Sequence, residues 1–345
     1  MKNIFLLLFI SITIFSCKKK KGIPDVSDIK ADITLQRFDK DFFSIDSNDV
    51  LPGLNRIHGG YPVLTDIFLQ NILGVDSAST LIGVRRFLHL NESIDNSVNK
   101  VFTNNTIDDL KKQFQKAFQF TKYYFPDYKL PKIITVVGPI DALAQMHNMY
   151  TPDFLGPDFL GISLQFYLGK NFEVYNEPYF IENVAPQYRS RRFSKEYIIG
   201  DAMTLIVDDL FPDKSSGLPL VEQMIEKGKQ WYLLDKFLPT TPDSVKTGYT
   251  QLQLDWCKEN EGNIWSEIIK NEDLNSLNPI VIQTYIGDGP YTQGFSPEYS
   301  PGNLGQWIGW QIVKKFVSKN SGMKPEEIMR LDAKKILEGA KYKPR

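Results

Sequence analysis

Histidine spacing is the first test for catalytic chemistry, because a zinc site on a helix needs two ligands four residues apart, as in His-Glu-x-x-His. His58, His89 and His147 are scattered along the chain, and none has a ligand at that spacing. On the helix expected from Ser194, Asp201 is followed four residues later by a leucine. The sequence therefore predicts no metal site.

Other reaction types leave weaker local traces. The sequence does not exclude a Ser-His-Asp triad, because the members of a triad are neighbours in space and not in the chain. It has no Gly-x-Ser-x-Gly motif, however, which is the local signal that would favour one. Gly287-Asp288-Gly289 lacks the third glycine of a dinucleotide fingerprint. Asp208 and Asp209 close a predicted helix, where a solvated end is the simpler interpretation. Cys257 is expected to be a small buried residue. We predict no catalytic residue and no cofactor.

Covalent chemistry is indicated at Cys17. The apolar stretch from Ile4 to Phe15 follows Lys2 and is too short to cross a bilayer, which takes about 20 residues, so it fits a secretory signal. Its end, Ile14-Phe15-Ser16-Cys17, resembles the cleavage box of bacterial lipoproteins, in which the cysteine is acylated. We predict a signal peptide at residues 1–16 and lipidation at Cys17; the alternative is an ordinary signal with an incidental cysteine.

Residues 17–30 are predicted to be a lipidated basic tether. Lys18 to Lys21 follow the cysteine, and on an anionic leaflet each lysine contributes up to about 1 kcal/mol. The alternative is a solvated tether without an energetic role. Extended, the segment reaches about 45 Å. No later apolar run has the length of a membrane span, so the lipid is expected to be the membrane attachment.

The segment from Gly287 to Gly302 is rich in glycine, proline and aromatic residues and precedes a helix with two tryptophans. A rigid loop of this kind is a candidate surface for a peptide or glycan. The candidate residues are Tyr291, Phe295, Tyr299, Trp307 and Trp310. The simpler interpretation is that the rings fold back over the core. Gly305 and Gly309 predict a close approach to another helix.

Periodicity predicts strands early in the chain and helices late. Strands are expected at 31–38, 132–138 and 161–169, the last a half-buried edge strand. The expected helices are 61–73, 106–125 from a capping box at Thr106, 194–209, 219–237, 250–270, one from Ser300 as N-cap, and a last one carrying Met329 and Leu337. No repeat or linker divides residues 31–345. We predict a single helix-rich α+β domain with a small sheet in its N-terminal half.

Composition narrows the class of protein. The 345 residues are 42% hydrophobic, which is enough to bury a core and excludes a disordered chain. The balance of 40 basic and 41 acidic side chains argues against nucleic acid as a partner. Two cysteines and three histidines are too few for a disulfide scaffold or a Cys/His metal cluster.

Several long motifs carry a family resemblance. They are the cleavage box at Cys17, the segments Ile33–Phe43, Leu233–Ser244, Trp256–Trp265 and Gly305–Val313, the shorter Asp288–Tyr291 and Gly294–Pro297, and the closing Lys341–Arg345. Together they resemble the gliding-motility lipoprotein GldB family of Bacteroidetes-type bacteria, over essentially the whole mature chain. The resemblance implies a non-catalytic, lipid-anchored protein needed for surface gliding, a process tied to the type IX secretion system.

That family is also distantly similar to predicted zincin-like metallopeptidases, which implies a degenerate zincin-like fold. Those relatives carry His-Glu-x-x-His on the helix that begins here at Ser194, and both histidines are missing. Glu222 and Glu226 are the candidates for their later acidic ligand. The resemblance thus implies a binding scaffold on an enzyme frame.

Three functions follow as hypotheses. The first is a docking or assembly factor whose partners are the membrane, through Cys17, and other gliding-machinery proteins. The alternatives are a divergent hydrolase and a surface binder of peptides or glycans. The residue after Cys17 is Lys18 and not the aspartate that retains lipoproteins in an inner membrane. The segment from Lys18 to Lys21 is basic and so differs from the acidic run of surface-export signals. We therefore expect a periplasm-facing location, with inner or outer membrane open.

Overall fold

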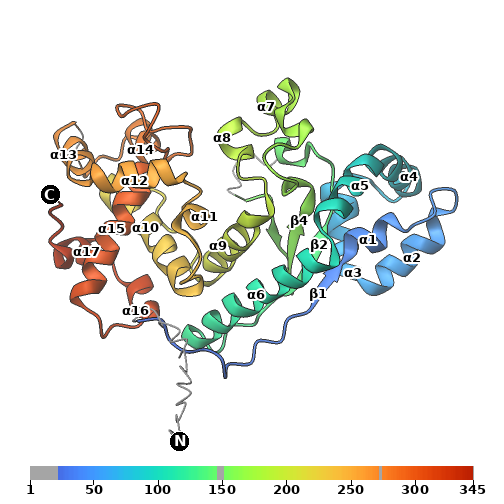
Figure 1. The fold of residues 1–345 in the computed structure, drawn as a ribbon, viewed down its shortest axis with the longest axis horizontal. Helices are drawn as coiled ribbons and strands as arrows, with labels where there is room; N and C mark the ends of the chain where they lie inside the picture. The colour runs from blue at the N-terminus through green and yellow to red at the C-terminus, as the bar shows by residue number, and fades with distance from the viewer. Residues whose placement is uncertain (1–21, 146–150, 272–273, 345) are drawn as a thin grey trace, which may run out of the picture.

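The computed structural model describes residues 22–145, 151–271 and 274–344, and within them the predicted helix-rich α+β fold is confirmed. The small sheet lies in the middle of the molecule (Figure 1). Helices α1–α5 form one end and α10–α17 the other, with the long α6 running beneath the sheet.

Four short strands form the sheet in the order β1-β2-β4-β3. They are β1 Leu35–Arg37, β2 Lys132–Val136, β3 Phe154–Leu155 and β4 Phe159–Ser163. The first, second and fourth strands are parallel, and β3 runs antiparallel to β4. The strand predicted at 132–138 is confirmed, whereas the one predicted at 31–38 is shortened because a helix begins at Phe38.

The predicted edge strand at 161–169 is wrong. β4 ends at Ser163, pairs on both sides and is buried throughout, and a 3-10 turn follows at Leu164–Phe166. The polar residues of the alternating pattern are buried as well, since the Tyr167 hydroxyl bonds to Asp153, whose other oxygen accepts the Ser163 N–H. The pattern arose from a buried polar network and not from one solvated face.

The N-terminal helices are α1 Phe38–Phe43, α2 Val50–Gly60, α3 Pro62–Ile67, α4 Thr80–Leu90, α5 Glu92–Val101 and α6 Asn104–Tyr124. The helix predicted at 61–73 is α3 continued by a π turn at Phe68–Ile72. The N-cap of α6 is Thr103, whose side chain accepts the Thr106 N–H, so the predicted start at Thr106 is three residues late.

A cluster of phenylalanine rings holds this end together. Phe68, on the π turn, is fully buried, and its ring centroid lies 5.1 Å from Phe38, 4.8 Å from Phe42 and 5.7 Å from Phe87. Most of these contacts are edge-to-face, which is the arrangement that aromatic quadrupoles favour. We call Phe38, Phe42, Phe68 and Phe87 the phenylalanine cluster.

Part of the predicted tether packs on the body. Val26 is fully buried, and the Ile29 carbonyl accepts a hydrogen bond from the Gln119 side chain of α6. Cys17, the signal peptide and Lys18 to Lys21 lie outside the described residues.

The later helices are α7 Pro178–Asn183, α8 Gln187–Ser190, α9 Ile198–Leu210, α10 Leu220–Phe237, α11 Asp243–Thr247, α12 Gln251–Glu259, α13 Glu261–Asn271, α14 Pro279–Ile286, α15 Leu304–Lys319, α16 Pro325–Arg330 and α17 Ala333–Ala340. The helices predicted at 194–209 and 219–237 are confirmed as α9 and α10.

Two predicted helices are each divided by a polar residue. The helix expected at 250–270 breaks at Asn260, whose side chain donates to the Trp256 carbonyl while its own carbonyl starts α13. The last helix breaks before Asp332, which caps α17 by accepting the Lys334 N–H.

Ser300 is not the N-cap of α15, which begins four residues later. Its hydroxyl is buried without a hydrogen-bond partner among the described residues. The Thr292 hydroxyl instead accepts the Leu304 N–H and donates to the Pro301 carbonyl, so the preceding loop caps the helix from a distance.

The predicted close approach at Gly305 and Gly309 is confirmed, and α10 is the partner helix. A methyl group at Gly309 would lie 1.7 Å from the Met224 carbonyl oxygen, and one at Gly228 would lie 2.2 Å from the Gly309 carbonyl carbon. Backbone therefore touches backbone. We call this contact of Met224, Gly228, Gly305 and Gly309 the glycine seam.

Candidate functional site

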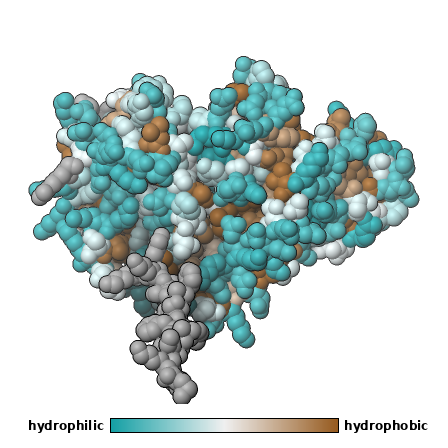
Figure 2. Space-filling view, in the orientation of Figure 1, coloured by the Kyte–Doolittle hydropathy of each residue, from teal (hydrophilic) through white to brown (hydrophobic). Residues whose placement is uncertain are grey.

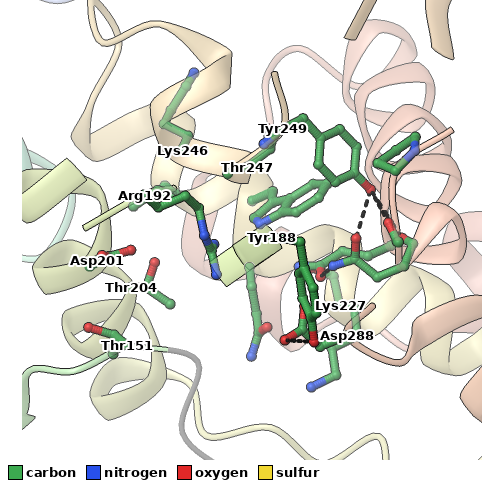
Figure 3. A pocket seen from close by; sticks show the side chains of 18 of the residues that line it. Thr151, Tyr188, Arg192, Asp201, Thr204, Lys227, Lys246, Thr247, Tyr249 and Asp288 are labelled. Carbon is green, nitrogen blue, oxygen red and sulfur yellow. Dashed lines mark hydrogen bonds between the residues drawn. The ribbon is translucent and has the colours of Figure 1, made fainter. Parts of the chain in front are cut away.

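A cavity of about 340 Å³ lies where α9, next to the sheet, faces the C-terminal helices (Figure 3). This volume is within the range of small-molecule sites. Its walls are the Asp201 face of α9, the Lys227 to Leu234 face of α10, the turn from Thr247 to Tyr249, the segment from Tyr188 to Arg192, and both ends of the 288–303 loop.

Arg192 is placed in the cavity by its neighbours. The next residue, Phe193, is buried in an aromatic cluster and stacks near Phe166 and Tyr175, with centroids 5.5 and 5.3 Å away. Gly248 has a left-handed backbone, φ +72°, and a methyl group there would lie 2.4 Å from the Arg192 guanidinium. Only glycine at 248 satisfies both the backbone and the space that Arg192 fills.

Three polar side chains, Asp201, Thr204 and Asp208, line the wall formed by α9. Burial raises the pKa of Asp201 to about 6, against the lowering influences of Arg192 and of the hydrogen bond from Tyr167. Burial also raises the pKa of Asp208 to about 6, with Lys227 acting in the opposite direction. Gln230 donates to Asp208 over 2.8 Å. Both groups are therefore carboxylates at neutral pH that give up a proton less readily than usual.

A buried polar network lies behind Asp201. The Tyr167 hydroxyl is 2.8 Å from Asp153 and 3.2 Å from Asp201, yet it has one proton to donate. Both contacts are satisfied when one carboxyl group holds a proton. Complete burial, followed by the charge of Asp201, raises the pKa of Asp153 well above its usual range, which favours Asp153 as the carboxyl group that holds the proton.

Most other charges at the cavity are paired. Lys227 binds Asp213 at 2.6 Å, and Arg189 binds Asp288, which also accepts from the Tyr188 hydroxyl. Lys246 points away from the cavity and is paired with Asp235 and Asp243 (Figure 3).

The predicted aromatic surface is only partly at the surface. Tyr291 and Tyr299 are 41% and 38% exposed, and Phe295 is half-buried against Trp256. Trp307 and Trp310 are each 2% exposed, so their inclusion in a binding surface was wrong. The Trp310 indole donates to Asp235 over 3.0 Å and belongs to the core behind the cavity.

The other sequence candidates lie apart from one another. Cys257 is buried, as predicted, and burial raises its pKa. Glu222 pairs with Lys334 and Glu226 with Lys229, while His147 lies outside the described residues. Within residues 22–145, 151–271 and 274–344, no three His, Cys, Asp or Glu side chains are grouped so as to hold a metal ion.

The family model of the gliding motility protein GldB matches residues 19–344, which is nearly the whole chain. The protein belongs to the GldB family. Its members are gliding-motility lipoproteins, which indicates membrane attachment through lipid. In the described part of the chain, no helix has the length and apolar character needed to span a bilayer. No curated protein and no solved structure matches the chain, and the zincin-like similarity stays a prediction.

Sequence reasoning missed Arg192, Tyr188 and Lys227 as site residues and treated Asp208 as a solvated helix end. One available signal was the run Arg189-Ser-Arg-Arg192, three arginines in four residues of a chain with almost no net charge. The pairing of two of them, with Asp288 and with the Gly248 carbonyl, depends on contacts across 57 to 99 residues.

Proposed function

We propose that this protein is a lipid-anchored envelope component of the gliding machinery that works by docking other proteins and catalyses no reaction. The family match over residues 19–344 carries the proposal, since it covers the whole body and not one motif. Lipid on Cys17 would hold the body at the membrane, facing the periplasm, beside the type IX secretion machinery.

The surface offers apolar side chains suited to docking. On α4, Ile82 is 71% exposed, Leu90 62% and Leu81 43%, and Figure 2 shows hydrophobic side chains at the surface at this end. A second group lies before and on α14, where Leu277 is 61% and Ile280 77% exposed. Leu277 and Ile280 are three positions apart, and neighbouring exposed apolar residues of this kind are typical of protein contact sites.

The test is genetic. A deletion strain is expected to lose gliding, and the Cys17→Ala variant is expected to leave the membrane fraction and to fail to restore movement. Crosslinking in cells with mass spectrometry, comparing the wild type with Cys17→Ala, identifies the docked proteins. A deletion strain that glides and secretes normally would remove the proposal.

A second candidate function is hydrolysis with Asp201 as acid or base. It is favoured by one observation, the pKa of about 6 of a carboxyl group that lines a cavity. A broad protease and esterase screen, with metal analysis of the purified protein, distinguishes hydrolysis from docking. If the wild type turns over a substrate and Asp201→Asn abolishes this activity, the protein is a hydrolase and the docking proposal is wrong.

A further inference from the structure

Arg192 differs from every other cation at the cavity. In the described ranges its guanidinium makes no hydrogen bond and no ion pair within 4 Å, whereas Arg191 donates to the Gly248 carbonyl and Lys227 and Lys246 are paired with carboxylates. Figure 3 shows it pointing into the cavity, with Asp201 and Thr204 on one side and Tyr188 on the other. A half-buried guanidinium with open donors is suited to a carboxylate, which it binds in a bidentate manner.

The α9 wall carries the opposite charge. Asp201 and Asp208 have hydrogen-bond donors in Tyr167 and Gln230, but neither forms an ion pair with a described cation. Each therefore has lone pairs open to a ligand. Burial raises the pKa values of both carboxyl groups, and a cationic ligand group bound beside each would lower them again. The raised pKa values are therefore consistent with a site for a cation.

The spacing of the two carboxylates sets the length of the ligand. Asp201 and Asp208 are two helical turns apart on one face, a rise of about 10 Å. The two nitrogens of an extended lysine are about 7 Å apart, and hydrogen bonds of about 3 Å that leave each end at an angle to the helix axis cover the remaining distance of about 3 Å. Trp231 and Leu234 on the facing helix α10 offer apolar contact to the methylene chain.

We propose that the cavity binds a free basic amino acid of the lysine type, with its carboxylate on Arg192, its α-ammonium on Asp201 and its side-chain ammonium toward Asp208. The assignment rests on the proposed function only in treating the body as a binder. One positive and two negative protein groups meet one negative and two positive ligand groups.

The test is calorimetric titration of the full lipidated protein, purified in detergent, with lysine and three matched analogues. Lysinamide lacks the carboxylate, Nα-acetyl-lysine lacks the α-ammonium and norleucine lacks the side-chain ammonium. Each is expected to bind about 10-fold or more weaker than lysine, because each loses a charge-assisted hydrogen bond. Nα-acetyl-lysine also represents the C-terminal lysine of a peptide, and equal binding of it would overturn the free amino acid as ligand.

Variants locate each contact. Arg192→Gln is expected to remove the preference for lysine over lysinamide, and Asp208→Asn the preference over norleucine. The exposed Arg86→Gln of α4 is the control for lost charge and is expected to keep both. If a variant does not fold, the analogue series on the wild type still decides. Absence of lysine, ornithine and arginine binding, or preferences unchanged in the variants, would overturn the assignment and leave the deletion phenotype untouched.

Discussion

Phenylalanine rings fill the space between α1 and α4, whereas at the glycine seam the backbones of α10 and α15 touch with hardly any side chain between them. In the phenylalanine cluster, rings approach with centroids 4.8 to 5.9 Å apart, and rotation of a ring can absorb small changes. In the glycine seam, carbonyl groups meet backbone directly, and nothing there can rotate out of the way. The cavity is built on the seam side, since Lys227 lies next to Gly228 and Gln306 next to Gly305.

The difference indicates which end holds the site in place. α10 carries Lys227, Gln230 and Trp231 into the cavity, and its distance from α15 is fixed by backbone contact. The phenylalanine end carries exposed apolar residues and stays apart from the cavity lining. Rigid positioning belongs to the pocket, and adjustable packing belongs to the end where α4 carries one of the two proposed docking surfaces.

Adding atoms to the seam is the most damaging change expected. Gly309→Val places carbon atoms inside the van der Waals radius of the Met224 carbonyl and forces the two helices apart. We expect a loss of about 5 kcal/mol or more, enough to prevent folding of an ordinary domain. Thermal melting by circular dichroism measures it. The control is Gly59→Ala in α2, where the new methyl has no neighbour within 4 Å and stability should hold or rise.

Removing atoms from the phenylalanine cluster is expected to cause the next largest loss of stability. Phe68→Ala empties a fully buried ring site between three other rings and should cost about 3–5 kcal/mol in the free energy of unfolding. Urea denaturation measures it. Lysine binding should persist in the folded fraction. Its loss at native conditions would contradict the separation of the two ends.

Asp208 in the cavity is expected to make the stability of the protein depend on pH. Because folding raises the pKa of Asp208 from its usual value to about 6, the folded state binds the proton more tightly, and stability falls as pH rises from about 4 to about 6. Asp208→Asn removes this loss and should stabilise the protein by about 1–2 kcal/mol at pH 7, and far less at pH 4. Melting curves across this range test it. Exposed Asp32→Asn serves as control, and an equal gain at both pH values would contradict the cause.

Helix caps give the smallest contrast between the ends. Thr250 and Gln253 form a reciprocal capping box on α12, with hydrogen bonds of 3.1 and 3.0 Å. Thr103 caps α6 through a single bond of 3.4 Å. Thr250→Ala should therefore cost about 1 kcal/mol and Thr103→Ala about half of that. Chemical denaturation of both variants compares them, and the reverse order would be inconsistent with the geometry.

Helices and strands were predicted correctly from the sequence where residues next to them in the chain set their ends. Pro219 and Pro239 enclose α10, and the strand at 132–136 is a short apolar run, so both were found within two residues. Prediction failed where a distant group supplied the partner. Thr292 caps α15 in place of Ser300, and Asp153 binds the Ser163 N–H at the end of β4 and the hydroxyl of Tyr167, two residues that looked solvated.

The candidate site was less accessible to sequence reasoning than the fold. Arg192 lies in the cavity because Gly248, 56 positions later in the chain, leaves room for it and because Phe193 anchors the turn. Neither relation has a fixed spacing. The tryptophans of α15 looked like a surface because their role, donating to Asp235 and packing on Trp231, belongs to α10.

The burial of Val26 limits how far the body can lie from the membrane. If Cys17 carries the lipid, only the residues from Cys17 to Val26 are free to extend, and fully extended they span about 30 Å, less than the whole predicted tether would allow. The point at which the chain joins the body would then stay within about 30 Å of the bilayer surface. Any protein that the body meets must reach into this layer above the bilayer.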